Sequence, residues 1–141
     1  MRLIEIIRKK NYYTISIVGL AKNAGKTVTL NYLIEEAKST GLSIGITSTG
    51  RDGENLDVVT LTQKPLIFIA EGMYAATAKN ALMFSDAKLE ILETTGVYTP
   101  MGEVIIVRAR QGGNIQIAGP VSSSDMKYVT RRLKHYGAQV V

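Results

Sequence analysis

The chain has 141 residues, 45% of them apolar and 21% charged, with a formal net charge of +5 at pH 7. This size and composition predict one globular domain covering residues 1–141. The chain contains no cysteine, which excludes disulfide bonds, thiolate catalysis and cysteine-ligated metals, and its one histidine, His135, cannot form a zinc site alone. It has no signal-peptide pattern and no run of the roughly 20 apolar residues that span a membrane, so we expect a cytoplasmic protein.

The basic residues are scattered along the sequence. Their only clusters are Arg8–Lys10 and Arg131-Arg132, and neither is interleaved with aromatic residues on which bases could stack. We therefore do not expect nucleic-acid binding, and we attribute the positive charge to phosphate-bearing ligands or an acidic partner. The sequence leaves the formation of a homo-oligomer open.

A nucleotide-binding loop is predicted near the N-terminus. Residues 13–18 are rich in β-branched and aromatic residues, which predicts a strand, and Gly19 and Gly25 follow with five residues between them. Lys26 and Thr27 come directly after. In such a loop backbone N–H groups bind phosphate oxygens, the lysine neutralises the β- and γ-phosphates, and the threonine hydroxyl ligates Mg²⁺. The predicted nucleotide-binding residues are Gly19, Lys22, Asn23, Ala24, Gly25, Lys26, Thr27 and Val28.

The next elements alternate between helix and strand. Apolar residues at helical spacing from Leu30 to Ala37 predict a helix that ends at Gly41, a natural helix C-terminus. Residues 42–47 predict a strand, and the polar loop Ser48–Glu54 lies at its carboxyl end, where doubly wound sheets bind ligands. Asp52 in this loop is a predicted Mg²⁺ ligand, although an ordinary surface turn is the alternative interpretation.

Residues 66–70 predict a third strand, and the alanine-rich segment 72–82 predicts a helix. Residues 88–94 predict a further strand, in which Glu93 stands near the carboxyl end. An acid at this place is what a Walker-B position requires to hold Mg²⁺, so Glu93 is the second predicted metal ligand. Glu103 is a weaker alternative.

The last part of the chain predicts a β-hairpin and a helix. Residues 104–109 and 114–118 flank two glycines, as the strands of a hairpin do. Ser122–Tyr136 predicts a capped helix that stops at Gly137. Residues 138–141 look like the opening of another strand, so we interpret the chain as the N-terminal part of a longer protein. We expect an α/β fold with a mostly parallel sheet, flanked by helices and incomplete at its C-terminus.

Four separated blocks resemble the P-loop subunit of the reactivases that serve adenosylcobalamin-dependent lysine 5,6-aminomutase and ornithine 4,5-aminomutase. The blocks are Gly19–Thr27, Thr47–Glu54, Leu89–Gly96 and Ile117–Pro120. The resemblance implies a P-loop NTPase-like fold and a chaperone-like ATPase, which opens the aminomutase so that damaged cobalamin exchanges for fresh cofactor. It implies that Gly25, Lys26 and Thr27 hold ATP and Mg²⁺ and that Asp52 and Glu93 complete the metal shell. Lys26, Asp52 and Glu93 are accordingly the expected catalytic residues.

Three other functions remain open. The five residues between the glycines resemble the loop of dethiobiotin synthetase, so ATP could phosphorylate a small carboxylate substrate held by Arg51 and Asp52. A GTPase-type switch is disfavoured because the chain lacks the Asn/Thr-Lys-x-Asp motif that selects guanine, which points to ATP as the nucleotide. The chain could also be an interaction domain in which the nucleotide is only structural.

Overall fold

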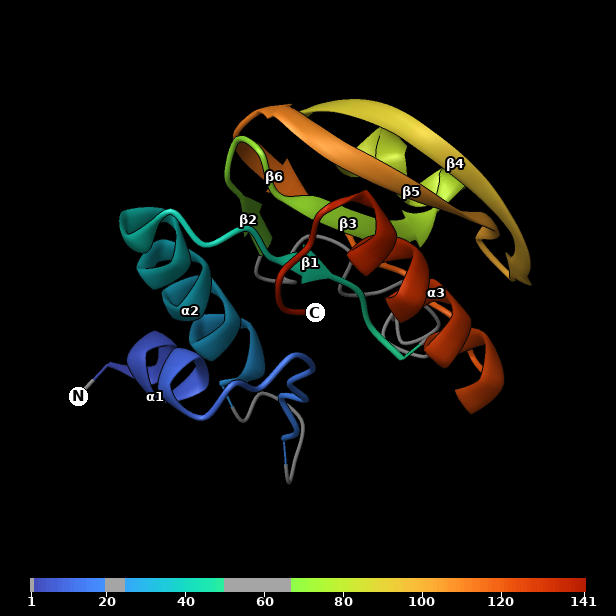
Figure 1. Ribbon diagram of the computed structural model, residues 1–141. Coiled ribbons are helices and arrows are strands. Elements are labelled where there is room, and N and C mark those ends of the chain that lie inside the picture. Colours follow the sequence, from blue (N-terminus) through green and yellow to red (C-terminus); the bar gives the residue numbers. More distant parts are fainter. Residues whose placement is uncertain (1, 20–24, 50–66) are drawn as a thin grey trace.

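The computed structural model describes residues 2–19, 25–49 and 67–141. In these ranges the helices are α1 (Leu3–Lys9), α2 (Lys26–Thr40) and α3 (Ser123–Tyr136), with a 3₁₀ helix η2 (Lys79–Phe84). The strands are β1 (Gly45–Ile46), β2 (Ile67–Ile69), β3 (Tyr74–Ala78), β4 (Lys88–Thr99), β5 (Gly102–Gln111) and β6 (Gly113–Ile115). Figure 1 shows α1 and α2 together on one side of β1 and α3 on the other.

The main sheet is mixed. Its strand order is β1-β3-β5-β4, with β1 parallel to β3 and both other pairs antiparallel, while β2 and β6 form a separate antiparallel pair. The α/β class is therefore confirmed, but the expected predominance of parallel pairing is wrong for the assigned strands. The physical reason is the tight connection between β4 and β5, where Gly102 adopts a φ of 107° and the chain reverses without a crossover helix.

Alternating side chains divide the core between the two faces of the sheet. Ala75, Ile105 and Val107 face the side that α2 covers, where they pack with Ile34 and other apolar residues. On the opposite face, Val129 and Leu133 of α3 pack in one cluster with residues of β3 and β5. This second cluster comprises Tyr74, Ala76, Val97, Val104, Ile106, Val129, Leu133 and Ala138.

Two extended segments continue the sheet beyond the strand that contains β1, and both run parallel to it. Residues 139–141 lie between residues 13–15 on one side and residues 43–45 on the other. The backbone hydrogen bonds are Val141 N to Tyr13 O (3.0 Å), Ile15 N to Val141 O (2.8 Å), Gln139 N to Ser43 O (2.8 Å) and Gly45 N to Val140 O (2.8 Å). The extended character predicted for residues 13–18 is thus confirmed as far as Ile15, and that predicted for 138–141 is confirmed.

Two predicted elements are wrong. Residues 74–78 form a buried strand instead of a helix, because their alanines fit between packed layers, and tertiary packing overrides the helix propensity of alanine. The predicted hairpin of 104–109 with 114–118 does not form, since β5 pairs with β3 and β4 whereas β6 pairs with β2. Helix α1 was not predicted.

The other helix predictions are confirmed. Helix α2 ends at Gly41, whose φ of 71° is the left-handed conformation expected at a helix C-terminus. Helix α3 begins after Ser122, whose hydroxyl accepts a hydrogen bond from the N–H of Asp125 at 3.1 Å, and it ends at Gly137. These ends fix where both long helices meet the sheet.

Candidate nucleotide site at the start of helix α2

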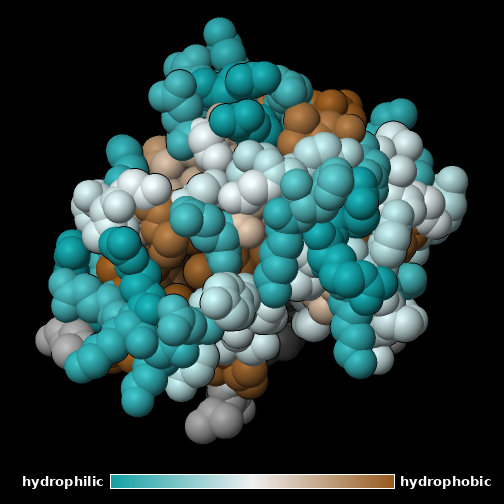
Figure 2. Space-filling model, viewed as in Figure 1, coloured by the Kyte–Doolittle hydropathy of each residue, from teal (hydrophilic) through white to brown (hydrophobic). Residues whose placement is uncertain are grey.

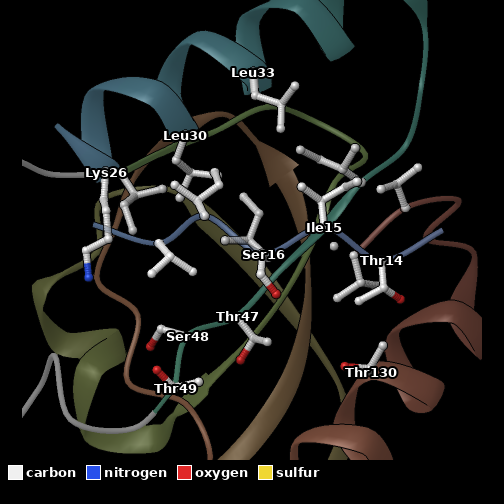
Figure 3. Close-up of a pocket in the computed structure, with 18 of the residues that line it drawn as sticks. Thr14, Ile15, Ser16, Lys26, Leu30, Leu33, Thr47, Ser48, Thr49 and Thr130 are labelled. Atoms are coloured by element: carbon white, nitrogen blue, oxygen red, sulfur yellow. The ribbon is translucent and has the colours of Figure 1, made fainter. Parts of the chain in front are cut away.

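A cavity of about 350 Å³ lies beside the first turn of α2. Figure 2 shows apolar side chains gathered in the hollow between α2 and β1, and Figure 3 shows the residues that line it. The lining comes from residues 14–18, helix α2, residues 44–49, Ile67 of β2, helix α3 and residues 140–141. The residues that carry polar groups into this region are Thr14, Ser16, Lys26, Thr27, Thr47, Ser48, Thr49 and Thr130.

The first turn of α2 is suited to an anion. Gly25 is the N-cap residue with a φ of 86°, a left-handed conformation that glycine adopts without a steric penalty. Gly25 carries no side chain that could cap the helix, and the first turn contains no acidic residue. The N–H groups of a helix start lack acceptors within the helix and form the positive end of its dipole, so phosphate oxygens are natural acceptors there.

Two predicted ligands occupy this turn. Lys26 and Thr27 both line the cavity. In Figure 3 the side chain of Lys26 extends from the first turn of α2 along the side of the cavity where Ser48 and Thr49 lie. The structure therefore brings the Lys-Thr pair next to the residues that follow β1, as a phosphate site between a loop and a neighbouring strand end requires.

The hydroxyl groups after β1 have different roles. Thr47 Oγ1 donates to the carbonyl oxygen of Ala76 at 3.0 Å, so this hydroxyl ties the end of β1 to β3. Ser48 Oγ accepts a weak hydrogen bond from the N–H of Gly119 at 3.3 Å, which leaves its own proton available to a ligand. Thr49 is exposed. Ser48 and Thr49 are therefore the better candidates for contact with a phosphate.

The remaining residues of the predicted loop are placed as follows. Gly19 ends the extended segment that enters the loop, and Val28 is 70% exposed and does not line the cavity. Lys22, Asn23, Ala24 and Asp52 lie outside the described residues. The predicted set is thus placed in the structure at Gly19, Gly25, Lys26, Thr27 and Val28, and only Lys26 and Thr27 line the cavity.

Glu93 is not brought to this site. It lies on β4, the edge strand at the opposite end of the sheet order from β1, and does not line the cavity. Its carboxylate accepts hydrogen bonds from Arg132 Nε at 2.9 Å, from Arg132 Nη2 at 2.5 Å and from the Tyr136 hydroxyl at 2.9 Å. Glu93 therefore joins β4 to α3. The alternative acid, Glu103, accepts from the N–H of Gly96 at 2.8 Å, again within the sheet.

Within residues 2–19, 25–49 and 67–141, no three His, Asp or Glu side chains are grouped closely enough to hold a metal ion. Of the predicted metal ligands, Thr27 is the one that lines the cavity. A single hydroxyl would suit Mg²⁺ that arrives with a nucleotide, because the ion keeps several waters and takes other oxygens from the phosphates.

Gly119 is a site residue that the sequence did not single out individually. A Cβ atom at this position would lie 1.9 Å from the carbonyl oxygen of Ser48 and 2.8 Å from Thr47 Oγ1. Only glycine lets the segment after β6 approach the end of β1 so closely. The block Ile117–Pro120 marked the segment, but nothing in its sequence indicates which strand end it touches.

No family model, curated protein or solved structure matches this chain. Among the described residues, none of the helices has the length and apolar character that a membrane crossing demands.

Gly119→Ala should destabilise the protein by about 1–3 kcal/mol, because the new methyl group forces apart the backbone at residues 48 and 119. Urea unfolding measures the change. Gly112→Ala is the control, because its Cβ would lie 3.1 Å from the carbonyl oxygen of Ile69 and 3.2 Å from the Phe68 ring, which are much milder approaches, so its loss should be smaller. Equal losses in the two variants would contradict the close approach described for Gly119.

Glu93 should make the stability of the protein depend on pH. The hydrogen bonds from Arg132 lower the pKa of the Glu93 carboxyl, with a further contribution from Tyr136. A lowered pKa in the folded state means that the ionised group stabilises the fold above the ordinary glutamate value of about 4.3, and that this stability is lost as the pH falls through the folded pKa.

The test compares Glu93→Gln with wild type by urea unfolding from pH 7 downward. The variant should be less stable at pH 7, and the difference should shrink under acid conditions. Glu90→Gln on the same strand is the control, because the Glu90–Arg110 pair is exposed and should contribute little. A difference for Glu93→Gln that stays constant down to the lowest pH would rule out this role of the carboxylate.

Proposed function

We propose that the chain binds ATP, with the triphosphate at the first turn of α2. The observation that supports this most directly is the position of Lys26 and Thr27, which line one cavity together with Ser48 and Thr49. The motif predicted these residue types, and the fold supplies the neighbouring strand end that a phosphate site uses. In a cell this function belongs to the cytoplasm.

The described residues would play different roles in binding the nucleotide. The backbone N–H groups at the start of α2 would donate to phosphate oxygens, and the Lys26 ammonium would offset the negative charge of the β- and γ-phosphates. The Thr27 hydroxyl would ligate the Mg²⁺ that accompanies the nucleotide, and Asp52 remains the proposed acid of the metal shell. ATP supplies a phosphoanhydride whose hydrolysis can drive a conformational change.

We further propose that this ATPase reactivates an adenosylcobalamin-dependent aminomutase by promoting exchange of damaged cofactor. Support comes from the blocks that carry the resemblance, because two of them touch beside the proposed phosphate site: Gly119 packs against Ser48. A nucleotide-dependent change in residues 47–49 would therefore reach the segment after β6. ATP can act on a partner only if the nucleotide states differ in their affinity for it.

Lys26→Ala should weaken the binding of MgATP by about tenfold or more, because a lysine that pairs with phosphate contributes charge-assisted hydrogen bonds of about 1.5–3 kcal/mol. Isothermal titration measures the affinity. Lys38→Ala removes the same charge at the far end of the same helix and should leave the affinity within about twofold. Equal affinities for wild type and Lys26→Ala would refute the proposed site.

The aminomutase proposal has its own test. Lysine 5,6-aminomutase inactivated with hydroxocobalamin is mixed with adenosylcobalamin and ATP, with wild type or Lys26→Ala. We expect recovery of mutase activity with wild type alone. If the protein binds ATP but its ATP turnover rises with small carboxylic acids and never with the mutase, the dethiobiotin-synthetase-like function replaces this proposal. Binding of the mutase that is unchanged by nucleotide and by Lys26→Ala would favour a simple interaction domain.

A further inference from the structure

Helix α3 carries a row of cationic side chains on one side. The helix holds four lysine or arginine residues and one aspartate, a formal net charge of +3 in a chain whose formal net charge is +5. Lys127, Arg131 and Lys134 follow one another at intervals of four and three residues, which places them on the same side of the helix. These three residues form the basic row.

The basic row lies on the side of α3 that faces away from the sheet. Val129 and Leu133 are fully buried and pack with residues of β3 and β5. In contrast, Lys127 and Arg131 are exposed, and Lys134 is partly buried. Figure 2 shows hydrophilic side chains gathered along α3. The charged groups of Lys127 and Arg131 therefore lie at the surface of the described part of the molecule.

The fold gives a role to one member of the row and not to the other two. Lys134 Nζ donates to Thr14 Oγ1 at 2.8 Å, and a lysine in the last turn of a helix is favoured by the helix dipole. Lys127 and Arg131 form no ion pair and no side-chain hydrogen bond within residues 2–19, 25–49 and 67–141. Contacts inside the described fold therefore do not explain these two charges.

The row is unfavourable for the helix by itself. Lys127 and Arg131 are like charges at i and i+4, an arrangement that destabilises a helix. Lys127 lies in the N-terminal half of α3, where the helix dipole does not favour a cation. Asp125 does not neutralise Lys127, because residues two positions apart do not face each other on a helix. A row of carboxylates brought to this side from outside the helix would relieve the repulsion.

We propose that the basic row binds an acidic helix of a partner protein, whose carboxylates are spaced by four and three residues. At a rise of about 1.5 Å per residue, the three cations span about 10 Å along α3, and carboxylates at i, i+4 and i+7 of a second helix repeat the same intervals. Charge complementarity then sets both the position and the direction of the partner. This interaction goes beyond nucleotide binding, because no residue of the basic row lines the cavity beside α2.

A nucleic acid matches the basic row less well than an acidic helix does. Proteins that bind duplex DNA commonly contact about 6–10 phosphates, whereas the row supplies three cations. Binding to a single strand would require exposed aromatic side chains on which bases stack. Tyr128, the aromatic residue next to Lys127, is instead partly buried and packs against the core cluster on the α3 side of the sheet.

The test is an NMR titration of the full chain with an alanine-rich helical peptide of about 18 residues that carries glutamates at i, i+4, i+7 and i+11. The largest changes in amide resonances should fall within residues 127–134. Lys127→Glu combined with Arg131→Glu should weaken binding by about tenfold or more, because two attractive pairs become repulsive. Lys127→Gln combined with Arg131→Gln removes the charges without reversing them and should give a smaller loss of about threefold.

The matched control is Lys79→Glu combined with Lys88→Glu, which makes the same change of net charge at two exposed lysines outside α3. Its affinity for the peptide should stay within about twofold of wild type, because charges far from the row are screened by salt. A second control peptide has the same composition with its glutamates spread evenly around the helix, and it should bind several-fold more weakly.

Equal binding of the two peptides, or equal losses in the two double charge reversals, would show attraction by net charge alone and overturn the proposal. Tighter binding of a DNA duplex of about 12 base pairs would assign the row to nucleic acid instead. Unchanged amide resonances in β3 and β5 show that each variant is folded. The charge reversal on α3 should leave MgATP affinity at the wild-type value, so this test and the nucleotide test fail independently.

Discussion

The hydrogen bonds that hold residues 139–141 between residues 13–15 and 43–45 are the constraint on which the rest of the structure depends. They join residues 13–15 and 139–141 to the segment that contains β1. As a result, residues 13–15 and 43–45 run parallel to each other on either side of residues 139–141. Helix α2 then starts beside the end of a neighbouring segment, so Lys26 and Thr27 share a cavity with Ser48 and Thr49.

Hydrogen bonds and close backbone packing connect residues 47–48 to β3 and to the segment after β6. Thr47 is tied to β3 through the carbonyl of Ala76, and Ser48 meets Gly119. Thr77 links β3 to the segment after β6, because its hydroxyl donates to the carbonyl of Gln116 and accepts from the N–H of Ala118. Residues 47 and 48 are therefore held both by β3 and by the segment after β6.

Local sequence patterns predicted the parts of this fold that local physics decides. The glycines at 25, 41 and 137 and the hydroxyl of Ser122 set helix ends, and each depends on residues within one turn. Lys26 and Thr27 were likewise predicted at a helix start, and this too depends on residues within one turn, because Gly25 directly precedes them. The carboxyl-end position of a strand, in contrast, does not reveal which ligand is near, so Glu93 was predicted beside Mg²⁺ and lies against Arg132 and Tyr136.

Pairing between distant segments could not be predicted from local patterns. The run 74–78 has the composition of a helix, but it forms a strand because its small residues meet packed layers on both faces. Residues 104–109 and 114–115 lie in strands, yet their partners are β2, β3 and β4, and the glycines between them do not join them into a hairpin. The contact of Gly119 with Ser48 is likewise a property of the assembled fold.

We propose that the nucleotide phosphates lie at the first turn of α2, beside residues 48–49. The most direct measurement is the change in backbone amide resonances and in amide exchange when MgATP is added to the full chain. We expect the largest changes at Lys26 and Thr27, with smaller ones at Ser48 and Thr49 and none at Glu93. The largest changes at β4 or α3, or no change at the start of α2 under saturating MgATP, would contradict it.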